Sequence, residues 1–159
     1  MEFQSQDKHG IGLSPFCRIT ARVDPVVSLG HAAHGERRFV PIIGGTVEGE
    51  QLRGEVLAGG VDWQVQRADG TLEIAAHYVL RGDDGALIEI RSEGYRHGPP
   101  DVMQKLARGE QVPADQYYFR TAITFQTGSE RWRHLNSLLA IGRGARTAGA
   151  ALIDVFLVR

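Results

Sequence analysis

The sequence predicts an all-β protein, a single antiparallel β-barrel of about eight to ten strands with two short helices. Three observations support this fold class. Apolar and polar residues alternate along most segments, as they do on strands with one buried face. The Asp-Gly pairs at 69–70 and 84–85 are strong hairpin signals. The 20 glycines in 159 residues, without any repeat, indicate many tight turns and bulges.

The first third of the chain predicts a tail and three strands. Residues 1–15 are expected to be a polar tail, and residues 16–159 a single domain. FCRITARV, from Phe16, alternates and ends at an Asp-Pro pair, HAAHGERR is a loop, and LRGEVLAGG is the third strand. The second strand, FVPIIGGTVEG, carries Gly44-Gly45, which predicts a bulge or a sharp bend. Gly59-Gly60 is expected to turn the chain at a barrel end.

The middle of the chain predicts a three-stranded meander. VDWQVQRADG, TLEIAAHYVLRGDDG and ALIEIRSEGY are joined by the two Asp-Gly turns. Strand side chains repeat every two residues, so Asp62 and Gln64 share one face of the first segment and Trp63 lies on the other. One face of the second segment is apolar: Leu72, Ile74, Ala76, Tyr78 and Leu80.

The last third predicts two short helices and two strands. Pro99-Pro100 opens the first helix, which ends at Gly109, and Ser129 caps a second one that places Trp132 and Asn136 on one side. The strands are QYYFRTAITF and ALIDVFLVR, with GRGARTAG as a turn-rich connection. Few prolines or lysines protect the strand edges, so a closed barrel is favoured over an open sheet. A barrel of about eight strands can hold one small ligand.

Composition and motifs exclude several function classes. The formal net charge is -1, which gives no reason to expect nucleic acid or a membrane as partner. MEFQSQDKHG lacks the apolar region of a secretory signal, and Cys17 is the only cysteine, so we expect a cytoplasmic protein. There is no phosphate-binding loop, and His31 and His34 lack a carboxylate at matching spacing. We therefore expect neither a cofactor nor a metal.

Polar side chains at strand spacing supply the candidate site. An arginine can hold an anionic oxygen, a carboxylate can act as general base, and a tyrosine can donate a hydrogen bond to developing negative charge. The sequence leaves two placements open, since these residues either line a cavity or form a wet outer face with weak ion pairs. Three pairs of polar residues each share one face of their own strand: Asp62 with Gln64, Glu73 with His77, and Tyr118 with Arg120.

Three motifs in this order resemble a known family. They are RRFVPIIGGTVEGEQLRGEVLAGGVDWQVQRADGT, HYVLRGDDGALIEIRSEGYR, and YYFRTAITFQTG with a following HLN. From Phe16 to the C-terminus the chain resembles domain of unknown function 3237. This resemblance implies a lipocalin-like, or calycin-like, β-barrel and supplies no established activity. The matching residues include Arg38, Asp62 and Trp63, while His77 stands where the pattern has an arginine.

Two hypotheses of function follow. The first is a barrel that binds a small, partly aromatic or oxygenated metabolite and, if it is an enzyme, acts as a cofactor-free isomerase, cyclase or lyase. Asp62, Glu73 and Arg120 are then the predicted catalytic residues, with Asp62 pairing inside the barrel with Arg120 or Arg38. The second is a non-catalytic carrier or dimer-forming module whose barrel is filled by side chains, with contacts at ALIDVFLVR and an exposed Trp132. The predicted ligand-binding residues are Arg38, Trp63, His77, Tyr118, Trp132 and Asn136.

Overall fold

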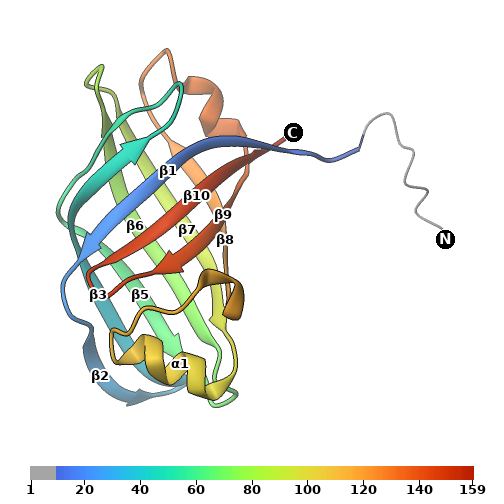
Figure 1. The fold of residues 1–159 in the computed structure, drawn as a ribbon. Helices are drawn as coiled ribbons and strands as arrows, with labels where there is room; N and C mark the ends of the chain where they lie inside the picture. Colours follow the sequence, from blue (N-terminus) through green and yellow to red (C-terminus); the bar gives the residue numbers. More distant parts are fainter. Residues whose placement is uncertain (1–9) are drawn as a thin grey trace.

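The structure, a computed structural model, describes residues 10–159 as an antiparallel β-barrel with one α-helix (Figure 1). Two 3-10 helices, η1 and η2, lie in the connections that flank β8. The predicted fold class is confirmed. The strands are β1 (Leu13–Val23), β2 (Val27–Ala32), β3 (Gly35–Glu48), β4 (Gly54–Val56), β5 (Gly60–Gln66), β6 (Leu72–Gly82), β7 (Leu87–His97), β8 (Tyr118–Gln126), β9 (Ala140–Arg146) and β10 (Ala150–Val158). The helices are α1 (Pro100–Ala107), η1 (Ala114–Gln116) and η2 (Arg133–Ser137).

The sheet closes because β1 pairs with β10 on one side and with β3 on the other. From β10 the order runs through β9, β8, β7 and β6, and each neighbouring pair is antiparallel. Between β6 and β3, one strand position (a lane of the wall) is occupied by two consecutive strands, first β4 and then β5. The closed wall therefore has eight lanes, while β2 pairs only with β3.

The bend predicted at Gly44-Gly45 lies where β3 meets β1. Both glycines have positive φ angles, 151° and 144°. A Cβ atom on Gly45 would lie 1.9 Å from the carbonyl oxygen of Thr20, so only glycine permits this approach of the two strands. The pairing also shifts register between Arg22 and Val23, as at a β-bulge. Gly44-Gly45 thus bends β3 so that the barrel can close.

The sequence predicted that Gly59-Gly60 turns the chain at a barrel end, and this prediction is wrong. The pair lies between β4 and β5, which run in the same direction within one lane of the wall. Gly59 has a φ angle of 103°, and a Cβ atom on Gly60 would lie 2.5 Å from that of Tyr78. The pair therefore connects β4 to β5, and β5 continues the pairing with β6 that β4 began.

The two ends of the barrel differ in chemistry. At one end an apolar plug fills the interior between the strands, built around Trp132, Phe16 and Phe125. The rings of Phe16 and Trp132 are 5.9 Å apart, and those of Phe16 and Phe125 are 6.4 Å apart. At the opposite end, β7 ends and β8 begins, and α1 lies in the connection between them (Figure 1). This opposite end carries the polar interior residues described below.

Several predicted boundaries were wrong, for identifiable reasons. The predicted loop HAAHGERR contains the end of β2 and the start of β3. The predicted connection GRGARTAG contains most of β9. Its glycines are strand residues that leave room for side chains of β8, since a Cβ atom on Gly144 would lie 2.5 Å from the Phe119 ring. The second helix is the 3-10 helix η2. β1 begins at Leu13 inside the predicted tail, of which residues 1–9 lie outside the described residues.

The helices of the described chain are short. Over residues 10–159, none combines the length and the apolar character that a bilayer-spanning helix needs.

We expect Gly45→Ala to destabilise the barrel far more than Gly59→Ala. Both glycines have positive φ, so both variants carry backbone strain of about 1–3 kcal/mol. Only at Gly45 does the added methyl group also meet a backbone atom, and at Gly59 nothing lies within 4 Å. We expect a total loss of about 3 kcal/mol or more for Gly45→Ala, measured by urea denaturation. Equal losses for the two variants would contradict the close approach of β1 and β3.

Candidate functional site

One cavity lies inside the barrel, toward the end where α1 is found. Its walls are mostly aliphatic, with the ring of Phe119 on one side. The space between the lining atoms is about 540 Å3 including the open mouth, but the centres of water molecules can occupy only about 40 Å3 of it. At roughly 15 Å3 for one water, that is room for two or three. The wall residues with polar side-chain atoms are Asp62, Gln64, Tyr78, Ser92, Arg96, Thr121 and Arg146.

A chain of hydrogen bonds runs from the cavity to the barrel surface. Gln64 Nε2 donates to Asp62 Oδ2 at 2.7 Å, and Arg38 Nε donates to Gln64 Oε1 at 2.9 Å. Arg38 Nη1 lies 3.8 Å from a carboxylate oxygen of Glu36 on the exposed part of β3. A guanidinium has donors only, so Arg38 fixes which end of the Gln64 amide faces Asp62. The strand pairing of Arg38 with Gln64 brings these groups together.

Burial sets the protonation of Asp62. The apolar surroundings raise the pKa of Asp62 above its ordinary value, because burial disfavours the charged carboxylate. The hydrogen bond from Gln64 and the positive charges of Arg96 and Arg146 act in the opposite direction, but they offset burial only in part. Asp62 therefore holds its proton to a higher pH than an exposed aspartate does.

Two further arginines lie in the cavity wall, Arg96 at the end of β7 and Arg146 at the end of β9. Arg96 is only 7% exposed. Burial, with repulsion from Arg146 and Arg38, lowers the pKa of Arg96 to about 10, so its guanidinium still carries a charge at neutral pH. Burial also lowers the pKa of Arg146. The Tyr117 hydroxyl accepts a hydrogen bond from the backbone N–H of Arg146 at 2.8 Å, which holds the end of β9 in place.

Three buried polar atoms of residues that line this cavity have no hydrogen-bond partner. They are Asp62 Oδ1, Arg96 Nε and Arg146 Nη1, and within residues 10–159 no other buried side-chain nitrogen or oxygen is left unpaired. Unpaired buried polar atoms are rare and cost free energy, since each has lost water without gaining a partner. Their concentration in one cavity marks the strongest candidate site in the described chain.

The structure brings two of the predicted site residues together, Asp62 and Arg38, through Gln64. The expected partner of Asp62 was Arg120 or Arg38, and only Arg38 is part of this chain of contacts. Trp63, one of the predicted ligand-binding residues, lies on the outer face of β5 and is 38% exposed. There its ring is 5.2 Å from that of Phe39, with the guanidinium of Arg37 at 4.9 Å.

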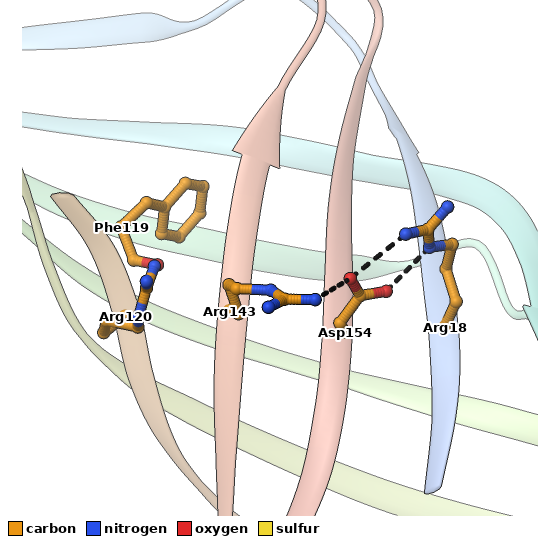
Figure 2. A network of polar contacts seen from close by, with 5 residues as sticks. All are labelled: Arg18, Phe119, Arg120, Arg143 and Asp154. Carbon is orange, nitrogen blue, oxygen red and sulfur yellow. Dashed lines mark hydrogen bonds and ion pairs between the residues drawn. The ribbon is translucent and has the colours of Figure 1, made fainter. Parts of the chain in front are cut away.

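Tyr118 and Arg120 lie on the outer face of β8, not in the cavity. The inward residues of this strand are Phe119 and Thr121, which line the cavity. Arg120 Nη1 donates to the backbone oxygen of Phe119 at 3.0 Å, and its guanidinium lies 5.6 Å from the ring of Tyr118. Figure 2 shows Arg120 at the level of a surface network across the neighbouring strands, in which Arg18 and Arg143 both donate to the carboxylate of Asp154.

Glu73 and His77 also point away from the cavity. They alternate along β6 with the buried residues Leu72, Ile74 and Tyr78. His77 is exposed, and its Nε2 lies 3.2 Å from a carboxylate oxygen of Glu89 on β7. Both residues therefore belong to the wet outer face.

The last two predicted residues, Trp132 and Asn136, lie at the plugged end. Trp132 is 2% exposed, so it is core and not the exposed contact surface that the second hypothesis expected. Its Nε1 donates to Asp84 Oδ2 at 3.3 Å. Asn136 exchanges two hydrogen bonds with the backbone of Thr127, at 2.7 and 2.9 Å, and so pins the loop after β8.

Sequence reasoning missed Arg96 and Arg146. Arg96 falls in the same phase of β7 as the fully buried Ile88 and Ile90, so alternation alone could have placed it inside. Arg146 lies in the glycine-rich stretch that was interpreted as a connection. No alternation marks it, because Gly142 and Gly144 occupy the inward positions before it.

Comparison with known sequences gives one family over nearly the whole chain. Residues 11–158 match the family described as protein of unknown function (DUF3237). A UPF0311 protein of Rhodopseudomonas palustris (strain ATCC BAA-98 / CGA009) is 41% identical over 140 residues, which cover 88% of this chain and 92% of that protein. A UPF0311 protein of Clostridium acetobutylicum is 36% identical over 141 residues, covering 88% of this chain and 89% of the relative.

Solved structures share the barrel. A conserved protein of unknown function from Rhodopseudomonas palustris superposes with a TM-score of 0.88 at 39% identity, covering 94% of this chain and 98% of that one. A beta-barrel like protein from Acinetobacter baumannii gives 0.84 at 36% identity, with 97% and 99% covered. A chain from Penicillium herquei, described as an enzyme, gives 0.71 at 20% identity, with 94% and 95% covered, which shows a common fold alone.

We expect Asp62→Asn to stabilise the protein at neutral pH. Burial raises the pKa of Asp62, so the native state favours the protonated form, and the charged form lowers stability above that pKa. Asparagine mimics the neutral form. We expect Tm to rise by about 2–4 °C, the effect of ~1 kcal/mol in a chain of this size and typical of one stabilising substitution.

The pH dependence supplies the control for this variant. As the pH falls through the pKa of folded Asp62, the wild-type residue also becomes neutral, and the difference in Tm should shrink. Thermal unfolding across a pH series measures both effects. A lower Tm for Asp62→Asn at neutral pH would mean that the surrounding arginines make the Asp62 charge a net stabilising one.

Proposed function

The chain belongs to the DUF3237 family, and from that premise we propose that its barrel binds a small oxygenated metabolite and moves a proton on it without a cofactor. The observation that carries this proposal is the set of three unpartnered atoms, Asp62 Oδ1, Arg96 Nε and Arg146 Nη1, on residues that line one cavity. A bound ligand with oxygen atoms would supply the missing partners. A barrel selected for stability alone would have apolar groups at these positions.

Asp62 is the proposed proton-transfer group. Gln64 donates to Oδ2, so a proton held by Asp62 resides on Oδ1, the oxygen without a partner in the cavity. Burial raises the pKa of Asp62, which brings a carboxyl group closer to the neutral range where a general acid or base is most effective. Asp62 can therefore take a proton from a ligand atom and return it to another.

Arg96 and Arg146 are the proposed electrostatic stabilisers, in place of the predicted Arg120. If Asp62 removes a proton from a carbon next to a carbonyl group, the electron pair moves to the carbonyl oxygen and forms an enolate. Positive guanidinium groups in a water-poor cavity stabilise such an oxyanion. If the ligand also carries a carbon–carbon double bond next to that carbon, the anion is a dienolate. Return of the proton from Asp62 to the far end of the dienolate then moves the double bond into conjugation with the carbonyl group, with no oxidant or reductant. The fungal structural neighbour described as an enzyme supports only the point that this fold accommodates catalysis.

A non-catalytic carrier is the second candidate, and the size of the cavity favours it. Room for two or three waters is little for a metabolite, so the barrel without ligand is nearly filled by its own side chains. The wall nevertheless combines buried arginines with apolar side chains. A ligand would place its polar group at the arginines, displace the waters and contact the apolar wall with the rest of its surface.

The experiment that tests the proposal is native mass spectrometry of the protein purified from its own host. We compare the wild type with Arg96→Met, which removes a cavity cation, and with Arg120→Met, which removes a cation of the outer face. We expect a small molecule bound to the wild type and to Arg120→Met, and at least a tenfold lower occupancy in Arg96→Met. Circular dichroism checks that both variants are folded.

The contrary outcomes are clear. A molecule lost from Arg120→Met and kept by Arg96→Met would move the site to the outer face of β8. A wild-type barrel that carries no molecule would favour the filled, non-catalytic alternative.

A further inference from the structure

We propose that the ligand is a monocarboxylate with an apolar, preferably aromatic, body, and that Arg96 and Arg146 hold its carboxylate inside the barrel. This inference rests on the proposed function and names the substrate class of the same site. It follows from the balance of charge in the cavity, the number of free donors and the nature of the walls.

The charge balance requires an anion. Arg38 has a carboxylate neighbour in Glu36, at 3.8 Å. Arg96 and Arg146 have none: no ion pair of residues 10–159 involves either of them. Asp62 is one carboxylate beside two buried guanidinium groups. Buried charges are ordinarily paired, because an unpaired one has lost its hydration without gaining a partner. The missing negative charge is therefore assigned to the ligand.

The donors fit a carboxylate. Arg96 Nε and Arg146 Nη1 are two free N–H groups on two different guanidinium planes. A carboxylate has two oxygens in one plane and accepts from arginine with strong, directional hydrogen bonds. Phosphate has more oxygens and more charge, and it would enter a cavity whose exposed wall is mostly apolar. The cavity therefore favours a singly charged group with few acceptors.

The walls select the rest of the ligand. Val40, Ile42, Ile74 and Ile153 form apolar surface beyond the polar group. The guanidinium of Arg96 lies 5.7 Å from the ring of Phe119, so an aromatic surface stands directly beside the charge. Gly144 and Arg96 already pack against this ring, so an aromatic acid would meet its edge while the carboxylate contacts the arginines. Because the cavity is small, a ligand must fit its shape as well as its charge.

The test uses three acids and their uncharged amides. The probes are benzoate, phenylacetate and hexanoate, compared with benzamide, phenylacetamide and hexanamide, with inorganic phosphate as a hydrophilic anion. Binding is measured by thermal shift and by isothermal titration calorimetry at low salt. We expect at least one acid to bind saturably, with benzoate or phenylacetate ahead of hexanoate, while each amide and phosphate bind at least tenfold more weakly.

Matched variants place the binding inside the barrel. We expect Arg96→Met and Arg146→Met to weaken the binding of the acid at least tenfold, while Arg120→Met leaves it unchanged. No binding by any of the acids, equal binding by acids and amides, tighter binding of phosphate, or loss in Arg120→Met would each overturn the inference. A variant that fails to fold is replaced by Arg96→Lys, which keeps the charge but not the two-oxygen geometry and should bind the acid more weakly than the wild type.

The native mass spectrum separates this inference from the proposed function. An uncharged compound retained by the wild type and lost in Arg96→Met would support the proposed function and overturn the carboxylate. A retained carboxylic acid would support both.

Discussion

Closure of the sheet between β1 and β3 is the constraint on which the whole cavity depends. In an open sheet, both faces of every strand would meet solvent or a covering layer, and Asp62 or Arg96 would be an ordinary polar residue. Closure gives every strand an inner and an outer face. It depends on Gly45, whose missing side chain lets β3 approach the backbone of Thr20. The unusual pKa of Asp62 is thus a consequence of how the wall closes.

The interior of the barrel is apolar at one end and charged toward the other. The rings of Trp132, Phe16 and Phe125 fill one end, and the hydrogen bond from Trp132 to Asp84 anchors the plug to the turn after β6. The charged side chains Asp62, Arg96 and Arg146 gather toward the other end, where they are desolvated. Because the aromatic plug blocks the first end, a ligand would reach these charges from their own end. This placement agrees with a role in binding.

Alternation predicted which residues share a strand face, but only packing shows which of the two faces points into the barrel. On β6 the apolar face was evident, and its residues Leu72, Ile74, Tyr78 and Leu80 are buried in the barrel. On β8 the two faces look alike, since Tyr118 and Phe119 are both aromatic, and the candidate residues Tyr118 and Arg120 came from the face that lies outside. Phe125 and Ile123 in phase with Phe119 carried the deciding signal. Arg146 was beyond reach, because its strand is defined by contacts of glycines with β8, which no local pattern records.

The interior charge also explains why composition was uninformative about function. The net charge of -1 predicts no long-range attraction of charged partners, and none is needed here. Arg38, Arg96 and Arg146 act over short distances, inside a low-dielectric wall where one unpaired charge outweighs many on the surface. The Arg18–Asp154–Arg143 network on the outer face has similar groups, yet there they pair with one another (Figure 2). Discrimination between ligands would therefore arise after entry, when water has been displaced, and would depend on whether the ligand completes the pairing that the protein leaves open.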